Sequence, residues 1–261
     1  MKLSIIIPTC NEKDYLQKTL NAAHNHASGK HGIEILVIDC GSTDGTTEII
    51  RQKSVVVVTN PMLLGKKWAS LRLGARLAQG DVFLFLDADT LLPPDYDIAI
   101  ANALLNDRVM GGAFEFSFIE KSPLLSLVTY VNRIRYRFRR RFYGDQGIFV
   151  RRTAYTISGG WPERQLMEAA YFCKKLQEHG KLAIIHPPVR TSGRRFIEGG
   201  ILRVFFHDIR IWWQDLIGND VEKYGSAYWQ HNQKKPAKIS RRKTESSKET
   251  AEYHQYRQQP D

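Results

Sequence analysis

The sequence predicts an α/β protein with a mostly parallel central sheet flanked by helices. Between residues 3 and 86, short apolar or β-branched runs alternate four times with stretches of helical periodicity, which is typical of parallel strands joined by helical crossovers. The run VFLFL at residues 82–86 is apolar at every position, as expected for a central strand covered on both faces. We therefore expect a Rossmann-like sheet.

Each element follows from its own local pattern. Runs of β-branched and aromatic residues bounded by turn residues predict strands, and apolar residues at helical spacing after a capping residue predict helices. Strands are expected at residues 3–8, 33–38, 55–59, 82–86, 110–118, 148–151 and 182–185. Helices are expected at residues 14–24, 46–52, 65–78, 96–105, 167–179 and 201–217, with a basic loop at 192–196.

Length and composition favour one globular domain. The chain has 261 residues and a hydrophobic content of 43%, enough for a substantial core. We expect a single domain over residues 1–230 and a disordered basic tail over residues 231–261, because that stretch is polar and lacks periodicity.

Cysteine usage and charge limit the compartment and the partners. The three cysteines are widely spaced without a C-x-x-C motif, and no apolar run has the length of a secretory signal or a membrane span, which predicts a cytoplasmic protein. The formal net charge of +11 is compatible with nucleic acid, an anionic membrane surface or phosphorylated substrates. No known nucleic-acid-binding module is present, so we predict no nucleic-acid partner.

Two carboxylates follow the predicted central strand. Asp87 and Asp89 are one residue apart, so they point the same way in an extended chain, at the end of the strand where open α/β sheets bind ligands. Two such charges repel each other unless a cation lies between them, and oxygen ligands suit Mg²⁺ or Mn²⁺ held together with substrate phosphates. The alternative is a pair of solvated loop carboxylates.

Further polar clusters come directly after other predicted strands. Residues 9–12 and 39–44 are expected along the same sheet edge as the aspartate pair, at the crevice of a nucleotide-binding fold. Neither G-x-G-x-x-G nor G-x-x-x-x-G-K-[ST] is present, which argues against a dinucleotide fold and an ATPase phosphate loop. Asp39 and Asp44 have an alternative interpretation as turn and cap residues. Lys66 and Lys67 fit phosphate binding and a solvated helix start equally well.

An ordered set of motifs resembles family 2 glycosyltransferases of the A-type fold. The set is SIIIPTCNE at residues 4–12, VIDCGSTDGT at 37–46, and GD at 80–81 leading to DAD at 87–89. The resemblance covers about residues 1–215, and GDQGIF at 144–149 with GGWPE at 159–163 resembles a compact bacterial subgroup. It implies a nucleotide-sugar-binding half at residues 1–110 and an acceptor-side half at residues 111–230.

The resemblance also implies roles for individual residues. A nucleotide-sugar donor and Mg²⁺ or Mn²⁺ are expected. The positions matching the family's nucleoside pocket are Pro8, Thr9, Glu12 and Asp39; those matching its ribose, metal and diphosphate contacts are Asp87 and Asp89, with Asp89 the direct metal ligand. Lys66 is a further candidate for phosphate. Arg194 and Arg195 resemble a basic-aromatic motif near the diphosphate, where arginine gives bidentate contacts.

The chain departs from the family pattern at its catalytic base. The family's usual Glu-Asp pair at the start of a helix is Glu168-Ala169 here, so the usual aspartate is missing. A base is needed because a hydroxyl is a poor nucleophile at neutral pH, and the two candidates are Glu168 and Asp145. The activity predicted is an inverting, metal-dependent glycosyltransferase, and the alternative is a non-catalytic nucleotide-sugar-binding scaffold. Cys40 replaces a second aspartate that many relatives carry, which leaves the choice of donor open.

An arginine-rich stretch accounts for part of the surplus charge. Six arginines alternate with apolar residues at 133–142, and the segment fits either a helix or a strand. Together with the aromatic helix at 201–217 it predicts a basic-aromatic face on an anionic membrane, with a lipid or lipid-linked glycan as acceptor at the inner face of the cell membrane. A solvated lip around an unknown acceptor is the alternative interpretation.

Overall fold

The computed structural model describes residues 1–51 and 55–225. The strands are β1 (Lys2–Thr9), β2 (Gly32–Asp39), β3 (Val56–Thr59), β4 (Val82–Phe85), β5 (Thr90–Leu91), β6 (Val109–Phe118), β7 (Ile148–Arg151) and β8 (Lys181–Thr191). The helices are α1 (Lys13–Asn25), α2 (Thr46–Arg51), α3 (Lys67–Leu77), α4 (Tyr96–Ala103), α5 (Pro123–Arg139), α6 (Arg152–Ile157), α7 (Glu168–Gln177), α8 (Arg194–Gly199) and α9 (Ile201–Leu216). Short 3₁₀ helices are η1 (Pro61–Leu63), η2 (Gly144–Gln146) and η3 (Glu222–Tyr224).

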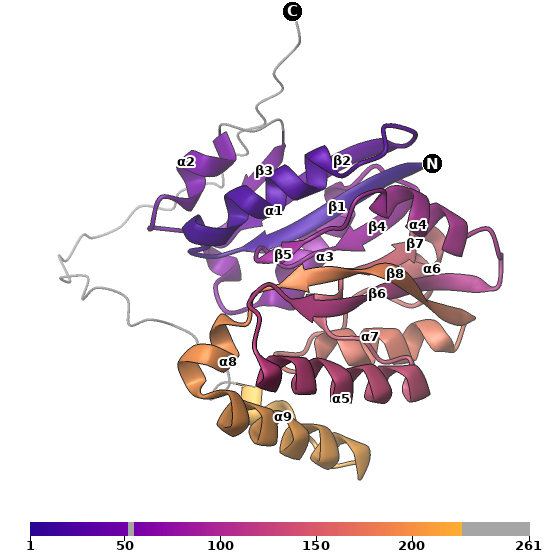
Figure 1. Cartoon of the computed structure of the whole chain (residues 1–261). Coiled ribbons are helices and arrows are strands. Elements are labelled where there is room, and N and C mark those ends of the chain that lie inside the picture. The colour runs from indigo at the N-terminus through magenta and orange to yellow at the C-terminus, as the bar shows by residue number, and fades with distance from the viewer. Residues whose placement is uncertain (52–54, 226–261) are drawn as a thin grey trace, which may run out of the picture.

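One eight-stranded sheet runs through the molecule in the order β3-β2-β1-β4-β7-β6-β8-β5. The strands β3, β2, β1 and β4 are parallel, and β6 pairs with β8 in parallel. β7 lies between these two groups and is antiparallel to both β4 and β6, and β5 is antiparallel to β8. Helices cover both faces of the sheet (Figure 1). The predicted α/β class with a mostly parallel sheet is therefore confirmed.

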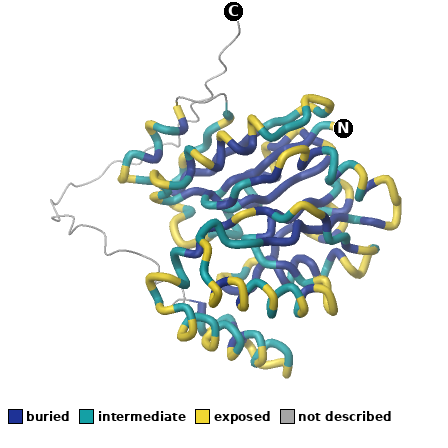
Figure 2. The backbone as a smooth tube through the Cα atoms, in the orientation of Figure 1, coloured by how far each residue is buried: buried dark blue, intermediate teal, exposed yellow. Residues whose placement is uncertain are grey.

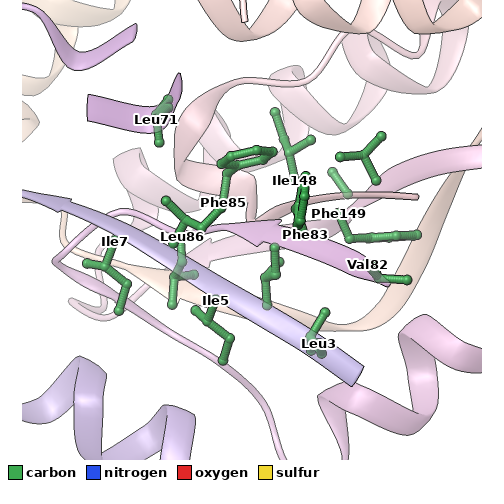
Figure 3. Close-up of a cluster of buried hydrophobic side chains, with 14 of the residues drawn as sticks. Leu3, Ile5, Ile7, Leu71, Val82, Phe83, Phe85, Leu86, Ile148 and Phe149 are labelled. Atoms are coloured by element: carbon green, nitrogen blue, oxygen red, sulfur yellow. The ribbon is translucent and has the colours of Figure 1, made fainter. Parts of the chain in front are cut away.

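The core lies where the apolar strands meet. Side chains of β1, β4 and β7, among them Ile5, Phe83 and Phe149, are almost fully buried and pack together (Figure 3). On one side of the sheet, Phe85 meets the ring of Trp161 edge-on with centroids 5.0 Å apart, and Trp161 stacks on Phe172 of α7 at 4.6 Å. These rings hold α7 against the central strand, which fixes the position of Glu168 at its first turn.

Some predicted elements differ from the structure. The predicted basic loop at 192–196 is wrong in part, because α8 begins at Arg194. β8 extends beyond the predicted residue 185 through Pro187 and Pro188, since it lies between β6 and the two-residue strand β5 near the sheet edge, where proline is tolerated. The stretch at 124–142 is helical up to Arg139. The predicted tail at 231–261 and the end of the helix predicted at 46–52 lie outside the described residues.

Candidate active site

The residues that follow β1, β2 and β4 meet at one edge of the sheet. Thr9 and Asp39 are paired in register at the ends of β1 and β2, and β4 ends one residue before Leu86 and the aspartate pair. The side chain of Thr9 is buried, and its hydroxyl has no hydrogen-bond partner in the described chain. The predicted clustering of these loops is therefore observed.

Asp87 is paired with a lysine from α3. The Nζ atom of Lys67 lies 2.6 Å from Oδ1 of Asp87, and about a quarter of each side chain is exposed. Burial opposes the charged form of Lys67, but the attraction of Asp87 outweighs it and raises the pKa of the lysine above its usual value. Gly144 backs this pair so closely that an added Cβ would lie 2.6 Å from Nζ of Lys67 and 3.3 Å from Oδ2 of Asp87.

Asp89 is paired with an arginine from α8. The Nη2 atom of Arg194 lies 3.4 Å from Oδ2 of Asp89 and 2.5 Å from Oε1 of Glu12, so one guanidinium bridges the loop after β1 and the aspartate pair. The guanidinium also lies 4.5 Å from the ring centroid of Tyr15. Burial, and then the charge of Asp87, raise the pKa of Asp89 to about 7, although Arg194 opposes the shift. Burial raises the pKa of Glu12 as well.

The two candidate bases lie within electrostatic reach of the same lysine. Lys67 interacts with Asp87, Glu168 and Asp145. Burial and the charge of Asp87 raise the pKa of Asp145 to about 6, and its buried Oδ1 has no hydrogen-bond partner in the described chain. Burial also raises the pKa of Glu168, whose side chain is almost fully covered at the start of α7.

The remaining predicted residues have diverse environments. Asp39 is fully buried and accepts hydrogen bonds from the backbone of Gly41 and from the backbone and hydroxyl of Ser42, so it organises the turn after β2. Pro8 is half-buried at the end of β1, and Lys66 is exposed at the cap of α3. Arg195 forms an ion pair with Asp208 of α9.

Sequence reasoning did not single out two features of this site. It treated the lysines at 66 and 67 alike and selected Lys66, whereas the structure turns Lys67 toward Asp87. It also missed Gly144, because the close approach of its backbone to the ion pair depends on the fold. The sequence showed two lysines at the start of a helix. Which of them faces Asp87 depends on how that helix is rotated against the central strand.

Most of the arginines at 133–142 have partners inside the molecule. Arg133 and Arg137 reach the buried carboxylate of Glu115 on β6, at 3.1 Å and 2.7 Å. Arg135 stacks on the ring of Tyr143 at 3.8 Å, and Arg141 lies 3.2 Å from Asp215 of α9. These contacts attach α5 to the sheet and the segment after α5 to α9. The arginines of this stretch are therefore in large part structural counter-ions.

The carboxylates at the sheet edge fit a divalent cation. The described residues contain no group of three or more histidine, cysteine or acidic side chains arranged to enclose a metal ion. Burial raises the pKa of Asp89, Asp145, Glu12 and Glu168, and the charge of Asp87 adds to each shift, so negative charge accumulates around this pair. The buried, unpartnered Oδ1 of Asp145 and the accumulated oxygen ligands suit a hard cation that shares its coordination with a bound ligand.

A family profile decides the relationship of the chain. The profile described as "Glycosyl transferase family 2" matches residues 4–157, more than half of the sequence, including the loops after β1, β2 and β4 with the aspartate pair. The chain belongs to glycosyl transferase family 2. The resemblance predicted from the motifs is thereby confirmed.

Named members of the family match parts of the chain. A glycosyltransferase AglE from Haloferax volcanii is 37% identical over 91 residues, which are 33% of this chain and 30% of that protein. A dolichol-phosphate mannosyltransferase from Pyrococcus furiosus is 36% identical over 110 residues, 41% of this chain and 31% of that protein. The chain thus spans about a third of the length of these curated relatives.

Solved structures share the fold. TarS from Staphylococcus aureus superimposes with a TM-score of 0.57 at 17% identity, over 78% of this chain and 39% of that one. The mannosyltransferase PcManGT from Pyrobaculum calidifontis, solved with GDP-Man and Mn²⁺, gives a TM-score of 0.54 at 20% identity, over 70% and 55% of the two chains. At this identity the likeness establishes the A-type glycosyltransferase fold.

Proposed function

We propose that this family 2 member is a glycosyltransferase that moves a sugar from a nucleotide-diphospho-sugar donor to an acceptor hydroxyl. The observation that carries the proposal is the aspartate pair Asp87 and Asp89 at the ligand-binding edge of the sheet, each held by a cation, Lys67 and Arg194 respectively. Pro8, Thr9, Glu12 and Asp39 line the nucleoside side. Residues 1–110 form the donor half in this proposal, and residues 111–230 the acceptor half.

The activity is metal-dependent in this proposal. Asp89, with Asp87, holds Mg²⁺ or Mn²⁺ together with the donor diphosphate. When bound, the ion neutralises charge on the leaving diphosphate. Arg194 and Arg195 contribute positive charge near the same group, since arginine suits phosphate oxygens. Support comes from the fold neighbour PcManGT, whose structure contains GDP-Man and Mn²⁺.

The proposed reaction is a direct displacement with inversion. The acceptor hydroxyl attacks the anomeric carbon, a carboxylate takes the hydroxyl proton, and the nucleoside diphosphate leaves with the electrons of the broken bond. Asp145 and Glu168 are the candidates for the base, because both carboxyl groups have raised pKa values, and a base works best when its pKa lies near the working pH.

The proposed acceptor is carried by a lipid at the inner face of the cell membrane. Support comes from one matching relative, which is a dolichol-phosphate mannosyltransferase by name. In the part of the chain that the structure describes, no helix is both long and apolar enough to cross a membrane. Under this proposal the acceptor group reaches the sheet edge from the membrane surface.

The rival function is a non-catalytic nucleotide-sugar-binding scaffold. Ala169 favours it, because the aspartate usual at this position in the family is absent and Glu168 is almost fully covered. A scaffold binds donor and metal and transfers nothing. Donor binding and donor turnover therefore have to be measured separately.

The test begins with thermal unfolding against UDP-, GDP- and dTDP-sugars, each with and without Mn²⁺. A ligand at about a hundred times its dissociation constant adds about 2.7 kcal/mol to the free energy of unfolding. We expect one nucleotide class to stabilise the protein in the presence of metal, and Asp89→Ala to abolish the shift while the matched surface variant Asp14→Ala retains it. Stabilisation of Asp89→Ala equal to the wild type would contradict the site. Stabilisation without release of nucleoside diphosphate in any acceptor screen would favour the scaffold.

A further inference from the structure

The helix α9 packs against the molecule with its acidic side. Asp208 forms an ion pair with Arg195, and Asp215 accepts hydrogen bonds from the hydroxyl of Tyr171 at 2.7 Å and from Arg141 at 3.2 Å. Both carboxylates of the helix are thus used by partners on the inner side. Ile211 is the one residue of α9 that is fully buried.

The outer side of α9 is apolar. Leu202, Phe206 and Trp213, with Ile217 directly after the helix, follow one another at spacings of four, seven and four residues, so they share one face. Phe206 is 63% and Trp213 54% exposed. A helix on the surface of a globular domain normally buries such a face and exposes its charges. In α9, Phe205 and Trp212 are half-buried, but the stripe from Leu202 to Ile217 is left without cover in the described part of the chain.

A second exposed stripe runs along the neighbouring helix α5. Leu127, Tyr130, Ile134 and Phe138 lie on one side of it, and Phe138 is 84% exposed. The two helices are in contact and lie together beyond one face of the sheet, with α9 outermost (Figure 1). Exposed residues mark the outward turns of both helices (Figure 2). Exposed apolar stripes on two neighbouring helices are typical of an interaction site.

The exposed charged side chains of α5 and α9 are arginines, whereas the neighbouring helix α8 carries one exposed acid, Glu198. Arg203 and Arg210 are exposed on α9, and Arg139 and Arg140 are exposed at the end of α5. The sequence of α5 contains no acidic residue, and the two carboxylates of α9 have inner partners. Apolar and aromatic side chains flanked by arginines complement a surface that is apolar inside and anionic outside.

We infer that the outer faces of α5 and α9 dock on the surface of an anionic lipid bilayer. Aromatic and aliphatic side chains of the two stripes enter the boundary between headgroups and acyl chains, and the arginines contact lipid phosphates. The helices lie on the membrane and do not span it. This inference deepens the proposed function and rests on it for the lipid-borne acceptor.

Contacts made by the first two residues of α8 connect α9 to the sheet edge that carries the aspartate pair. Arg194, which contacts Asp89 and Glu12, opens α8, and the next residue, Arg195, is ion-paired with Asp208 of α9. α8 and α9 are also in contact with each other. The helix proposed to bind the membrane is therefore linked through α8 to the aspartate pair of the site.

The test measures co-sedimentation of the full chain with phosphatidylcholine vesicles, with and without phosphatidylglycerol. We expect binding that requires phosphatidylglycerol. Phe206→Ser/Trp213→Ser should lower the partition coefficient at least about tenfold. The matched variant Leu105→Ser/Ile157→Ser, which removes two exposed apolar residues outside the docking face, should bind as the wild type does.

Two double variants that each remove two arginines complete the test. Arg203→Gln/Arg210→Gln should weaken binding at least about tenfold, and Arg76→Gln/Arg108→Gln, exposed on other parts of the surface, should not. Light scattering of each variant reports whether the apolar face instead joins two copies of the chain. Absence of anionic binding, equal loss in both members of a pair, or a dimer dissolved by Phe206→Ser/Trp213→Ser would overturn the inference. Donor-dependent thermal shifts are recorded without lipid, so a failure of the proposed function is seen separately.

Discussion

Lys67 and Asp87 form an ion pair of 2.6 Å between the first turn of α3 and the end of β4. The lysine is also the cation that faces Asp145 and Glu168, so it balances three carboxylates at once. Arg194 does the same for Glu12 and Asp89 on the other side of the pair. Lys67 and Arg194 thus reduce the repulsion among five carboxylates, and Arg135 and Arg195 act on Asp145 as well.

The first prediction concerns the Lys67–Asp87 pair. Lys67→Met should reduce the free energy of unfolding by about 1–3 kcal/mol, because it leaves a partly buried carboxylate without its partner, at a site open enough to water to moderate the loss. Lys66→Met, at the exposed neighbouring lysine, should change it by less than about 0.5 kcal/mol. Denaturant unfolding measures both. A double-mutant cycle with Asp87→Asn should give a coupling energy of at least about 0.5 kcal/mol, and additive effects would contradict the pairing.

The second prediction concerns Gly144, whose backbone lies against this pair. Gly144→Ala places a methyl group 2.6 Å from Nζ of Lys67, so the flexible end of the lysine must shift beside Asp87. We expect a loss of less than about 1 kcal/mol in the free energy of unfolding, because the crowded atom is the end of a flexible side chain, and the Lys67–Asp87 coupling should fall in the Gly144→Ala background. Gly32→Ala is the control, because its nearest atom would be 3.7 Å away. Undiminished coupling in Gly144→Ala would show that the close approach has no effect.

The first four parallel strands were predictable because hydrophobic periodicity reports local structure directly. β1, β2, β3 and β4 lie within one or two residues of their predicted positions. The antiparallel insertion of β7 between β4 and β6 was not predicted, because strand order depends on long-range packing. β5 has two residues and α6 has six, which is too short for a periodic pattern to appear.

The carboxylates of the candidate site were predictable, and most of their partners were not. Asp87 and Asp89 follow a buried strand, and in a parallel sheet that position alone points to the ligand-binding edge. The pairing of Arg194 with Glu12 joins residues 182 positions apart in sequence, which no local pattern encodes. For the same reason the inward orientation of the acidic side of α9 became visible only in the folded chain.

The third prediction concerns the pH dependence of stability in metal-free protein. The pKa of Asp89 is raised from 3.8 to about 7, so the folded state holds this proton more tightly than the unfolded state. Its contribution to stability is complete below about pH 4 and is lost as the pH rises toward about 7. Asp89→Asn should therefore flatten the decline of the melting temperature over this range in EDTA. Asp14→Asn should leave the wild-type profile in place. A parallel decline in Asp89→Asn would show that other groups cause it.

The fourth prediction decides between the two candidate bases. Asp145 has a buried oxygen without a hydrogen-bond partner in the described chain, and its pKa is raised to about 6. Asp145 as a whole is half-buried, whereas Glu168 is buried. An acceptor hydroxyl can therefore approach Asp145 more readily. We expect Asp145→Asn to lower kcat at least about a hundredfold while donor binding, followed by thermal shift, is retained.

Glu168→Gln is the matched comparison, because it neutralises the other carboxylate next to Lys67 without changing its size. Its kcat should stay within about tenfold of the wild type and keep the rise through about pH 6 that titration of Asp145 produces. A larger loss of kcat in Glu168→Gln than in Asp145→Asn would assign the role of base to Glu168, at the start of α7. Equal transfer in both variants and the wild type would mean that neither carboxylate takes the proton. Donor binding by the wild type without any transfer would favour the scaffold function.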